Sequence, residues 1–539
     1  MDAEELAGRA LSRRSALKRG AATAFLLTQA SLFEQLVIAP VRPAAAATAF
    51  SDIQFDMGAF VHPAQIFNDG AGNVTAQFPV VFTLFLPAKL ARTPTKADQA
   101  ALANALNVIE AVYPASPSGV LIFSVSYGVP YFNRLPQTLV QSRMPHLASN
   151  PGRFVLEEAT AMPTDVVGGL VGGPGALIPG KTKDRFNVDV LIENNDVLFQ
   201  FRSDTMTNLT DVALWLAGSN TLNGSSVASP HFNGLFAFQP SRVQFMQPGM
   251  PRKVADSQGF EFASRINPNS SMVMGFVDQQ VDSSGPAQIC TFAGNSSAKL
   301  TDAVAGSYFD NGSIVHFSHL IDDLYQFYAT PGQDSNRPDG EPFLERCQYM
   351  FRSNQLGTVH GVPAEGNTDQ FTNGGGPAFV NNVFQGTNAA MLGAQDSGGT
   401  FAPGNQTLNA TFTGAGRIGH EAALQRVSRA TDGTPVHIRM DGPGIDTMDV
   451  PAFRTFPGAN GVDVPAGSNQ FKLQFAMFMP TADFFAQMRI AAAAQDLQHQ
   501  FLNDEDDDNG LERFITATRR QNLLVPPRRH RAFPLLELT

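Results

Sequence analysis

His437 is the side chain of this sequence best placed to do chemistry. It stands in residues 435–439 (Pro-Val-His-Ile-Arg), with Arg439 two positions later and a Gly/Pro-rich break at 441–444. A neutral imidazole can bind a metal or a haem iron. The simpler interpretation is a surface or capping histidine before a turn. His420 is a rival ligand, although its expected helical setting favours a structural role.

Other kinds of site lose support because their motifs are missing. The sequence has no serine nucleophile elbow, phosphate-binding loop, dinucleotide fingerprint or His-Glu-x-x-His pair. Cys290 and Cys347 form no Cys-x-x-Cys motif, which argues against a zinc ribbon, an iron–sulfur cluster and covalent haem attachment. One disulfide or two buried thiols remain open. His316 and His319 follow a strand pattern, so we do not expect them to form a metal-binding pair.

The first half of the chain shows alternating strand and helix patterns. Short apolar runs predict strands at residues 78–86, 119–127 and 196–202, and apolar alternation predicts another at 235–246. Apolar residues recur every three or four positions in 96–112, which predicts a helix, and 205–217 is a second helix. This order predicts an α+β fold with ferredoxin-like antiparallel sheets.

The second half repeats this order with long insertions. Strands are predicted at 312–317 and 471–479. One helix is predicted to begin at residue 322, and another to span 481–501. We therefore expect two ferredoxin-like domains, at 51–290 and 291–539, with an irregular Gly/Asn-rich insertion at 358–415. The acidic turn at 503–510 lacks EF-hand spacing and is interpreted as a solvated loop rather than a calcium site. The basic run at 528–531 either pairs with that turn or forms a solvated tail.

Residues 1–47 have the pattern of an export signal. Arg13 and Arg14 form a twin-arginine pair, followed by a weakly apolar stretch and an alanine-rich cleavage region at 43–47. The apolar stretch is too short and too polar for a membrane anchor. We expect a periplasmic or extracellular protein. Because this route carries folded chains, a cofactor is favoured.

The charge balance excludes some partners. Removing residues 1–47 leaves 31 basic and 44 acidic side chains, a net charge of −13. We therefore expect no binding to nucleic acid or to an anionic membrane surface. The 43 phenylalanines indicate a large apolar core, and the length favours at least two subdomains.

The ordered motifs resemble dye-decolourising (DyP-type) haem peroxidases. Residues 274–278, which contain Gly275 and Asp278, are similar to the distal Gly-x-x-Asp-Gly motif of that family. Residues 312–315 resemble its next strand, residues 437–439 resemble its proximal His-(Ile/Val)-Arg segment, and residues 471–485 resemble its final strand and helix. Arg454, seventeen residues after His437, stands where the family has a distal arginine.

The resemblance implies roles for these residues around haem b. The imidazole of His437 would face a porphyrin-sized hollow between two stacked sheets and bind the iron. Arg439 would bind a haem propionate. Asp278 would move a proton of hydrogen peroxide, although it could simply end a strand. Arg454 would stabilise developing negative charge, with Arg417 and Arg426 as rivals. The implied activity is oxidation of an organic electron donor, and a homodimer remains open.

Three departures from the family pattern support a second hypothesis. Gln279 replaces the second motif glycine, Ser318 and His319 replace the usual arginines, and residues 441–444 replace Asn-Pro-Arg. A glycine lets the backbone approach the haem, because it has no Cβ atom. The alternative is an exported, haem-free protein of the same fold that acts in binding or assembly.

Overall fold

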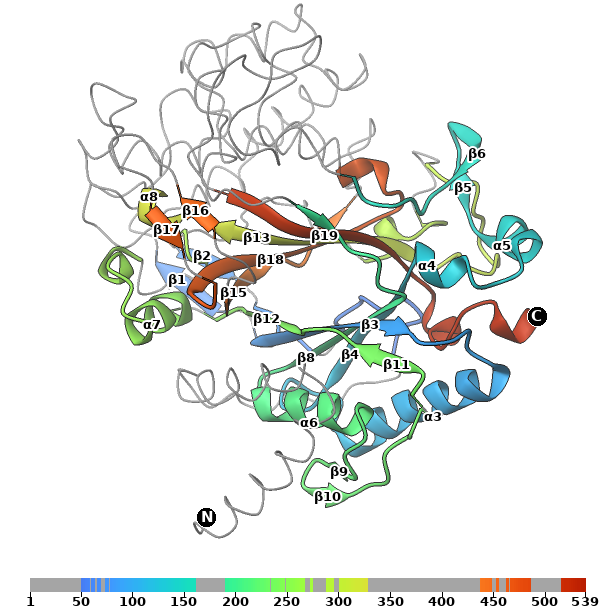
Figure 1. Cartoon of the computed structure of the whole chain (residues 1–539), viewed down its shortest axis with the longest axis horizontal. Helices are drawn as coiled ribbons and strands as arrows, with labels where there is room; N and C mark the ends of the chain where they lie inside the picture. The colour runs from blue at the N-terminus through green and yellow to red at the C-terminus, as the bar shows by residue number, and fades with distance from the viewer. Residues whose placement is uncertain are drawn as a thin grey trace, which may run out of the picture.

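The computed structural model describes residues 50–160, 190–274, 287–327, 437–454, 462–485 and 515–539, apart from short internal gaps. Within these ranges two antiparallel units combine into one large sheet that folds into two facing layers (Figure 1). The predicted α+β class with ferredoxin-like antiparallel sheets is confirmed. The domain boundary at 290/291 stays a prediction, and the signal at 1–47 and the insertion at 358–415 lie outside the described residues.

The first unit is a strand–helix–strand motif used twice. Its elements are β3 (Phe82–Leu90), α3 (Lys96–Val112), β4 (Leu121–Gly128), β8 (Val197–Ser203), α6 (Met206–Leu216), β11 (Phe236–Phe238) and β12 (Arg242–Phe245). β11 and β12 pair with β3, β3 pairs with β8 and β8 pairs with β4, all antiparallel. This is the ferredoxin-like order, in which the fourth strand lies beside the first.

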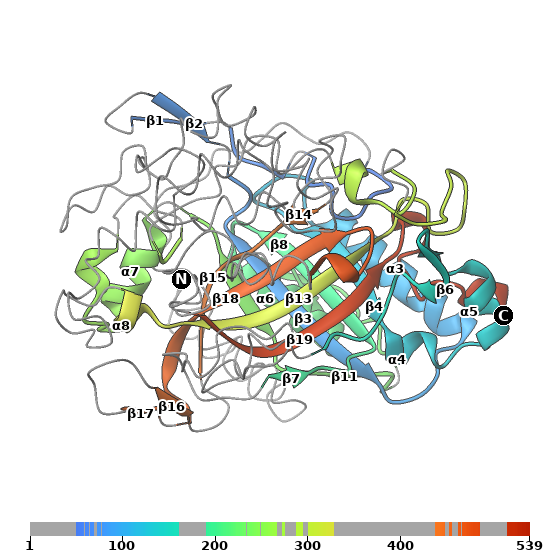
Figure 2. The same cartoon turned by 90° about the horizontal axis from the view of Figure 1, so that it is seen from above.

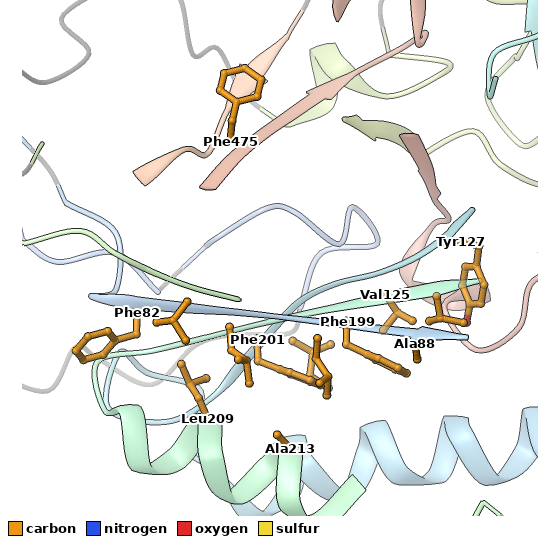
Figure 3. Close-up of a cluster of buried hydrophobic side chains, with 14 of the residues drawn as sticks. Phe82, Ala88, Val125, Tyr127, Phe199, Phe201, Leu209, Ala213 and Phe475 are labelled. Carbon is orange, nitrogen blue, oxygen red and sulfur yellow. The ribbon is translucent and has the colours of Figure 1, made fainter. Parts of the chain in front are cut away.

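Local sequence explains the first helix of this unit. Thr95 caps α3, and the Asp98 side chain returns a hydrogen bond to the Thr95 backbone, which forms a capping box. Leu102, Leu106 and Ile109 then lie on one buried face at helical spacing. In Figure 3, Phe199 and Phe201 point from the sheet toward Leu209 and Ala213 of α6, so both helices cover the same face.

The second unit repeats the topology of the first. Its elements are β13 (Ser313–Asp322), α8 (Leu324–Phe327), β14 (Ile438–Arg439), β15 (Gly442–Thr447), β18 (Asn469–Met479) and β19 (Ile515–Val525). β19 lies beside β13, β13 beside β18, and β18 beside β14 and β15, all antiparallel. The units join where β19 pairs with β4 and where β7 (Leu191–Ile192) runs parallel to β19. Figure 2 shows the second sheet lying over the first.

Shorter elements connect or flank the two sheets, and none of the described helices is long and apolar enough to cross a membrane. They are β1 (Gln65–Asn68), β2 (Asn73–Ala76), α4 (Val129–Phe132), α5 (Gln137–Arg143), β5 (His146–Leu147), β6 (Asn150–Phe154), β9 (Thr221–Leu222), β10 (Ser225–Ser226), α7 (Met250–Ser257), β16 (Ala452–Arg454) and β17 (Val462–Val464). Single-turn helices occur at Ala263–Arg265, Ala287–Cys290, Arg528–His530 and Leu536–Leu538.

Residues 526–539 return to the first unit. The Tyr127 hydroxyl donates to the Arg531 carbonyl oxygen at 2.7 Å and accepts from the Phe533 amide at 2.7 Å. Arg531 also forms an ion pair with Glu110 of α3, and Arg529 with Asp310 at 2.5 Å. The interpretation of this basic run as a solvated tail is therefore wrong. The acidic turn offered as its other partner lies outside the described residues.

Candidate functional site

His437 and Arg439 lie at the edge strand of the second sheet. Ile438, between them, pairs with Phe478 and belongs to the apolar cluster between the two sheets. Because side chains alternate along a strand, His437 and Arg439 fall on the opposite, outer face. His437 is only 4% exposed, so it is not a surface residue. This differs from the orientation that the resemblance implied, in which the imidazole of His437 faces a hollow between the two sheets.

The prediction of a hollow between the two sheets is wrong where the phenylalanine rings of the two sheets meet. Phenylalanine rings fill the layer: Phe85 stacks on Phe317 with centroids 4.5 Å apart, and Phe55 stacks on Phe478 at 4.6 Å. Phe123 packs edge-on against Phe478 at 5.5 Å. Rings this close leave no space for a porphyrin, because protein interiors pack at the density of organic crystals. A haem could therefore lie only elsewhere.

The outer face of the second sheet carries a buried polar cluster. His316 on β13 is fully buried, with Nδ1 2.6 Å from Asn522 Oδ1 and Nε2 2.5 Å from Ser318 Oγ. The Arg520 guanidinium donates to the Thr160 carbonyl oxygen at 3.0 Å. Figure 3 shows Phe475 on β18 pointing away from the first sheet, on this same side. The sequence did not identify Arg520 or Asn522 as members of a site.

Phe485 closes this cluster from the start of the segment after β18. The His316 ring stacks on the Phe485 ring, and the Arg520 guanidinium lies over it with Cζ 4.7 Å from the centroid. An arginine stacked on an aromatic ring keeps its charge while losing water, because the ring face is electronegative. The outer face of the second sheet is therefore both apolar and charged.

A buried carboxyl group ends β13. Asp322 is 6% exposed, and burial, reinforced by the negative charge of Asp441, raises the pKa of Asp322 well above its usual value of 3.8. Such a carboxyl group holds its proton into a higher pH range than an exposed aspartate.

The remaining predicted site residues are not brought together by the described structure. Gly275, Asp278 and Gln279 lie outside the described residues. Arg454 ends β16, which among the described residues pairs with β17 alone, in a separate two-stranded sheet. Of the predicted set, His437 and Arg439 alone share one short strand segment. The roles of Asp278 and Arg454 stay predictions.

The donor chemistry of His437 and Arg439 fits a haem group. An imidazole binds the iron, and a guanidinium matches the two oxygens of a propionate. His316 fits less well, since hydrogen bonds occupy both of its ring nitrogens. Cys290 is a free thiol in the apolar layer, and burial raises its pKa, which disfavours a thiolate ligand. Within the described ranges no three His, Cys, Asp or Glu side chains cluster as a metal site.

His316 and His319, three residues apart on β13, point to opposite faces. His319 faces the first sheet, where its Nε2 lies 3.0 Å from Asp446 Oδ2 on β15. The expectation that these two histidines form no metal pair follows from the same alternation. His319 instead belongs to a second polar region, at the open edge between the sheets.

A family of unknown function (DUF7405) matches residues 177–338. No curated protein matches the chain. Among solved structures, the encapsulated DyP-type peroxidase from Mycobacterium smegmatis is similar at 12% identity and a TM-score of 0.41, over 84% of this chain and 95% of that one. The DyP-type peroxidase from Cellulomonas bogoriensis is similar at 14% identity and a TM-score of 0.41, over 83% of this chain and 90% of that one. A Rhodococcus jostii RHA1 DypB variant in complex with heme is similar at 11% identity and a TM-score of 0.40, over 84% of this chain and 96% of that one. Likenesses this low assign neither activity nor cofactor.

Proposed function

We propose that this chain is a haem-dependent peroxidase of the DyP type that oxidises an organic donor with hydrogen peroxide. The observation that carries the proposal is His437, buried on the outer face of the second ferredoxin-like unit, with Arg439 on the same face. This histidine belongs to the one segment whose sequence resembles the proximal segment of that family. The buried polar cluster around His316 and Arg520 lies on this same outer face, which supports the assignment of the site to that face.

The chain's residues would divide the work as follows. Haem b, when bound, would supply the redox chemistry between peroxide and donor. His437 would hold it through one ring nitrogen, and Arg439 would orient it through a propionate. Asp278 would accept a proton from peroxide and return it to the departing oxygen. Arg454 would stabilise the negative charge that develops on that oxygen.

Absorption spectroscopy of the purified chain after haem loading tests this proposal. We expect a Soret band that His437→Ala abolishes or shifts, because the substitution removes the iron ligand. His146→Ala is the matched control, since His146 lies on β5 and pairs with Asp302 at the surface. Asp278→Asn should keep the band while peroxide turnover falls about 100-fold or more. A band that survives His437→Ala unchanged would refute the ligand assignment.

A haem-free binding role is the second candidate function. The phenylalanine-packed layer between the sheets favours it, because that layer leaves no internal space for a large cofactor. Gln279, in place of the motif glycine, favours it as well. The absence of a Soret band under every loading condition would select this function over the peroxidase.

Export by the twin-arginine route to the periplasm or beyond is part of the proposal. Replacing Arg13 and Arg14 together by lysine should retain the protein in the cytoplasm, because the pathway reads the arginine pair. Arg9→Lys changes a neighbouring basic residue without touching the pair and should leave export intact. Cell fractionation followed by immunoblotting measures both. Unchanged export of the double variant would rule this route out.

A further inference from the structure

A buried arginine lies between the two sheets with sulfur atoms as its hydrogen-bond acceptors. Arg202 on β8 is 1% exposed, and its Cζ lies 5.0 Å from the centroid of the Phe123 ring. Its Nη1 lies 3.2 Å from Sδ of Met57 and 3.9 Å from Sδ of Met440. In the described part of the chain this guanidinium donates to no carboxylate or carbonyl oxygen. A thioether sulfur is a weak acceptor, so Arg202 lacks the oxygen partner that a buried guanidinium normally has.

The charge of Arg202 therefore has little local compensation. Burial lowers the pKa of the guanidinium to about 10, while the negative charge of Asp204 acts in the opposite direction. The group still carries its charge at neutral pH. A charge that is buried without a strong hydrogen-bond acceptor destabilises the fold. An oxygen atom added to either neighbouring sulfur would supply such an acceptor.

Two methionines bring these sulfur atoms to Arg202 from segments far apart in the sequence. The Met57 carbonyl oxygen accepts from the Phe60 amide at 2.8 Å, and the Met440 amide donates to the Ala476 carbonyl oxygen of β18 at 2.7 Å. Both methionine side chains pack against the apolar layer between the sheets, yet both residues are half-buried and keep contact with solvent. A solute scarcely larger than water can therefore approach them, while the guanidinium stays inside.

The two nitrogen–sulfur distances distinguish the methionines. Sδ of Met57, 3.2 Å from Nη1, already lies in direct contact with the donor, which leaves no room for an oxygen atom between them. Sδ of Met440 lies 3.9 Å from the same nitrogen. An oxygen atom bonded to that sulfur can point toward Nη1 at the usual N–H···O distance of about 2.9 Å. Met440 is therefore the methionine whose oxidation would give Arg202 an oxygen acceptor with the least rearrangement.

We propose that Met440 is a site of reversible oxidation by hydrogen peroxide, at which Arg202 stabilises the sulfoxide. One oxygen atom of the peroxide forms a bond to Sδ while the O–O bond breaks. The sulfur loses two electrons, and the second oxygen atom leaves as water with both protons. Oxidation of a methionine normally disrupts apolar packing, because it introduces a polar group. At Met440 the new oxygen instead accepts a charge-assisted hydrogen bond from Arg202, which offsets that loss.

The sulfoxide connects the two units. Arg202 belongs to β8 of the first unit, and Met440 directly follows β14 of the second, three residues after His437. Exposure to peroxide thus strengthens a contact between the sheets instead of loosening it. The step requires no haem, so it is independent of the proposed peroxidase function and is tested whether or not the chain binds haem.

Treatment of the full chain with dilute hydrogen peroxide, followed by peptide mass spectrometry, locates the added oxygen. We expect Met440 to gain it before Met57, whose sulfur already lies against Nη1 of the arginine. Met477 and Met479, both 0% exposed, should stay unmodified in the folded chain. Methionine sulfoxide reductases acting with a thiol should remove the oxygen. Preferential oxidation of Met57, or no oxidation of Met440 before the chain unfolds, would overturn the proposal.

Met440→Gln tests the role of Arg202 without oxidation, because an amide oxygen can also accept from the guanidinium. It should raise the melting temperature by about 1–2 °C. Met246→Gln is the matched control, since Met246 is also half-buried and, among the described residues, no arginine donates to its sulfur. The control should not raise the melting temperature. Equal shifts for the two variants would contradict stabilisation by Arg202.

Arg202→Leu combined with Met440→Gln measures the coupling between the two positions. Leucine removes the donor together with the buried charge, so the gain from Met440→Gln should disappear in this background. Peroxide treatment should likewise lower the melting temperature of Arg202→Leu more than that of the unaltered chain, with Met440→Leu treated in parallel to report the effect of the other methionines. If Arg202→Leu does not fold, the comparison of Met440→Gln with Met246→Gln decides. A gain that persists without Arg202 would refute the assigned contact.

Discussion

The ring of Phe85 in the first sheet stacks on the ring of Phe317 in the second, with centroids 4.5 Å apart and planes 21° from parallel. Phe317 also supports the Arg242 guanidinium on the polar side of the same layer. One side chain thus contacts both the apolar layer between the sheets and a buried guanidinium. The stability of the two-layer arrangement should depend on it.

Phe317→Ala should therefore lower the free energy of unfolding by about 3–5 kcal/mol, the cost of a large cavity in a packed core. Phe317→Leu, which keeps most of the volume, should cost clearly less. Urea unfolding followed by circular dichroism measures both. Equal and small losses for the two variants would mean that the sheets do not pack through this ring.

The close packing of β12 against β15 predicts that alanine substitutions at two glycines of β15 differ in their effect on stability. A Cβ atom at Gly444 would lie 2.3 Å from the Val243 carbonyl oxygen, which is backbone and cannot move aside easily. The atoms nearest to a Cβ atom at Gly442 would all belong to the Gln244 side chain, the closest at 2.7 Å. Gly444→Ala should cost about 1–3 kcal/mol of unfolding free energy. Gly442→Ala should cost less, because a side chain can rotate. A larger loss of melting temperature for Gly442→Ala than for Gly444→Ala would contradict this close packing of β12 against β15.

Burial of the Asp322 carboxyl group predicts a stability that depends on pH. Because folding raises its pKa above 3.8, the group favours the fold fully below that pH and loses this contribution as pH rises. Asp322→Asn should therefore raise the melting temperature at pH 7, and the gain should shrink as pH falls toward 4. Asp256→Asn, exposed on α7, should change little at either pH. A gain that grows on acidification would reverse the assigned sign.

Two tyrosines predict a graded loss at the contact of residues 526–539 with the first unit. Tyr127→Phe removes one donor and one acceptor, which leaves the Arg531 carbonyl and the Phe533 amide unpaired. Tyr131→Phe removes only the donor to the Pro534 carbonyl oxygen, at 2.7 Å. The first should cost about 2 kcal/mol or more of unfolding free energy and the second about half of that. Equal costs would show that the hydrogen bonds do not determine this contact.

The elements with clear periodicity could be predicted from the sequence. The apolar spacing predicts the helix at 96–112 with its observed bounds, and the Thr95 cap found in the structure explains where it begins. The strand predicted at 235–246 is divided into β11 and β12 at Gln239–Pro240, where proline interrupts a ladder. The predicted helix at 481–501 is described only as far as Phe485.

The strand β19 was missed, and with it most of the buried polar cluster. Its four consecutive polar residues, Arg519, Arg520, Gln521 and Asn522, gave no strand pattern in the sequence, yet they occupy a central strand. Around these four residues both faces of the strand carry polar side chains, so no apolar alternation marks this part of the strand in the sequence. The face of His437 could not be predicted either, because shifting a strand by one residue exchanges its two faces, and only the pairing with β18 fixes that register.

The contact between Tyr127 and Arg531 joins residues 404 positions apart. During synthesis on the ribosome, the first unit emerges long before residues 526–539 are made, and until then its buried tyrosine hydroxyls lack these partners. Residues 526–539 thus supply hydrogen-bond partners to a unit whose strands and helices all precede them by more than 280 positions, so the polar interior of the first unit is completed only by a late-synthesised segment.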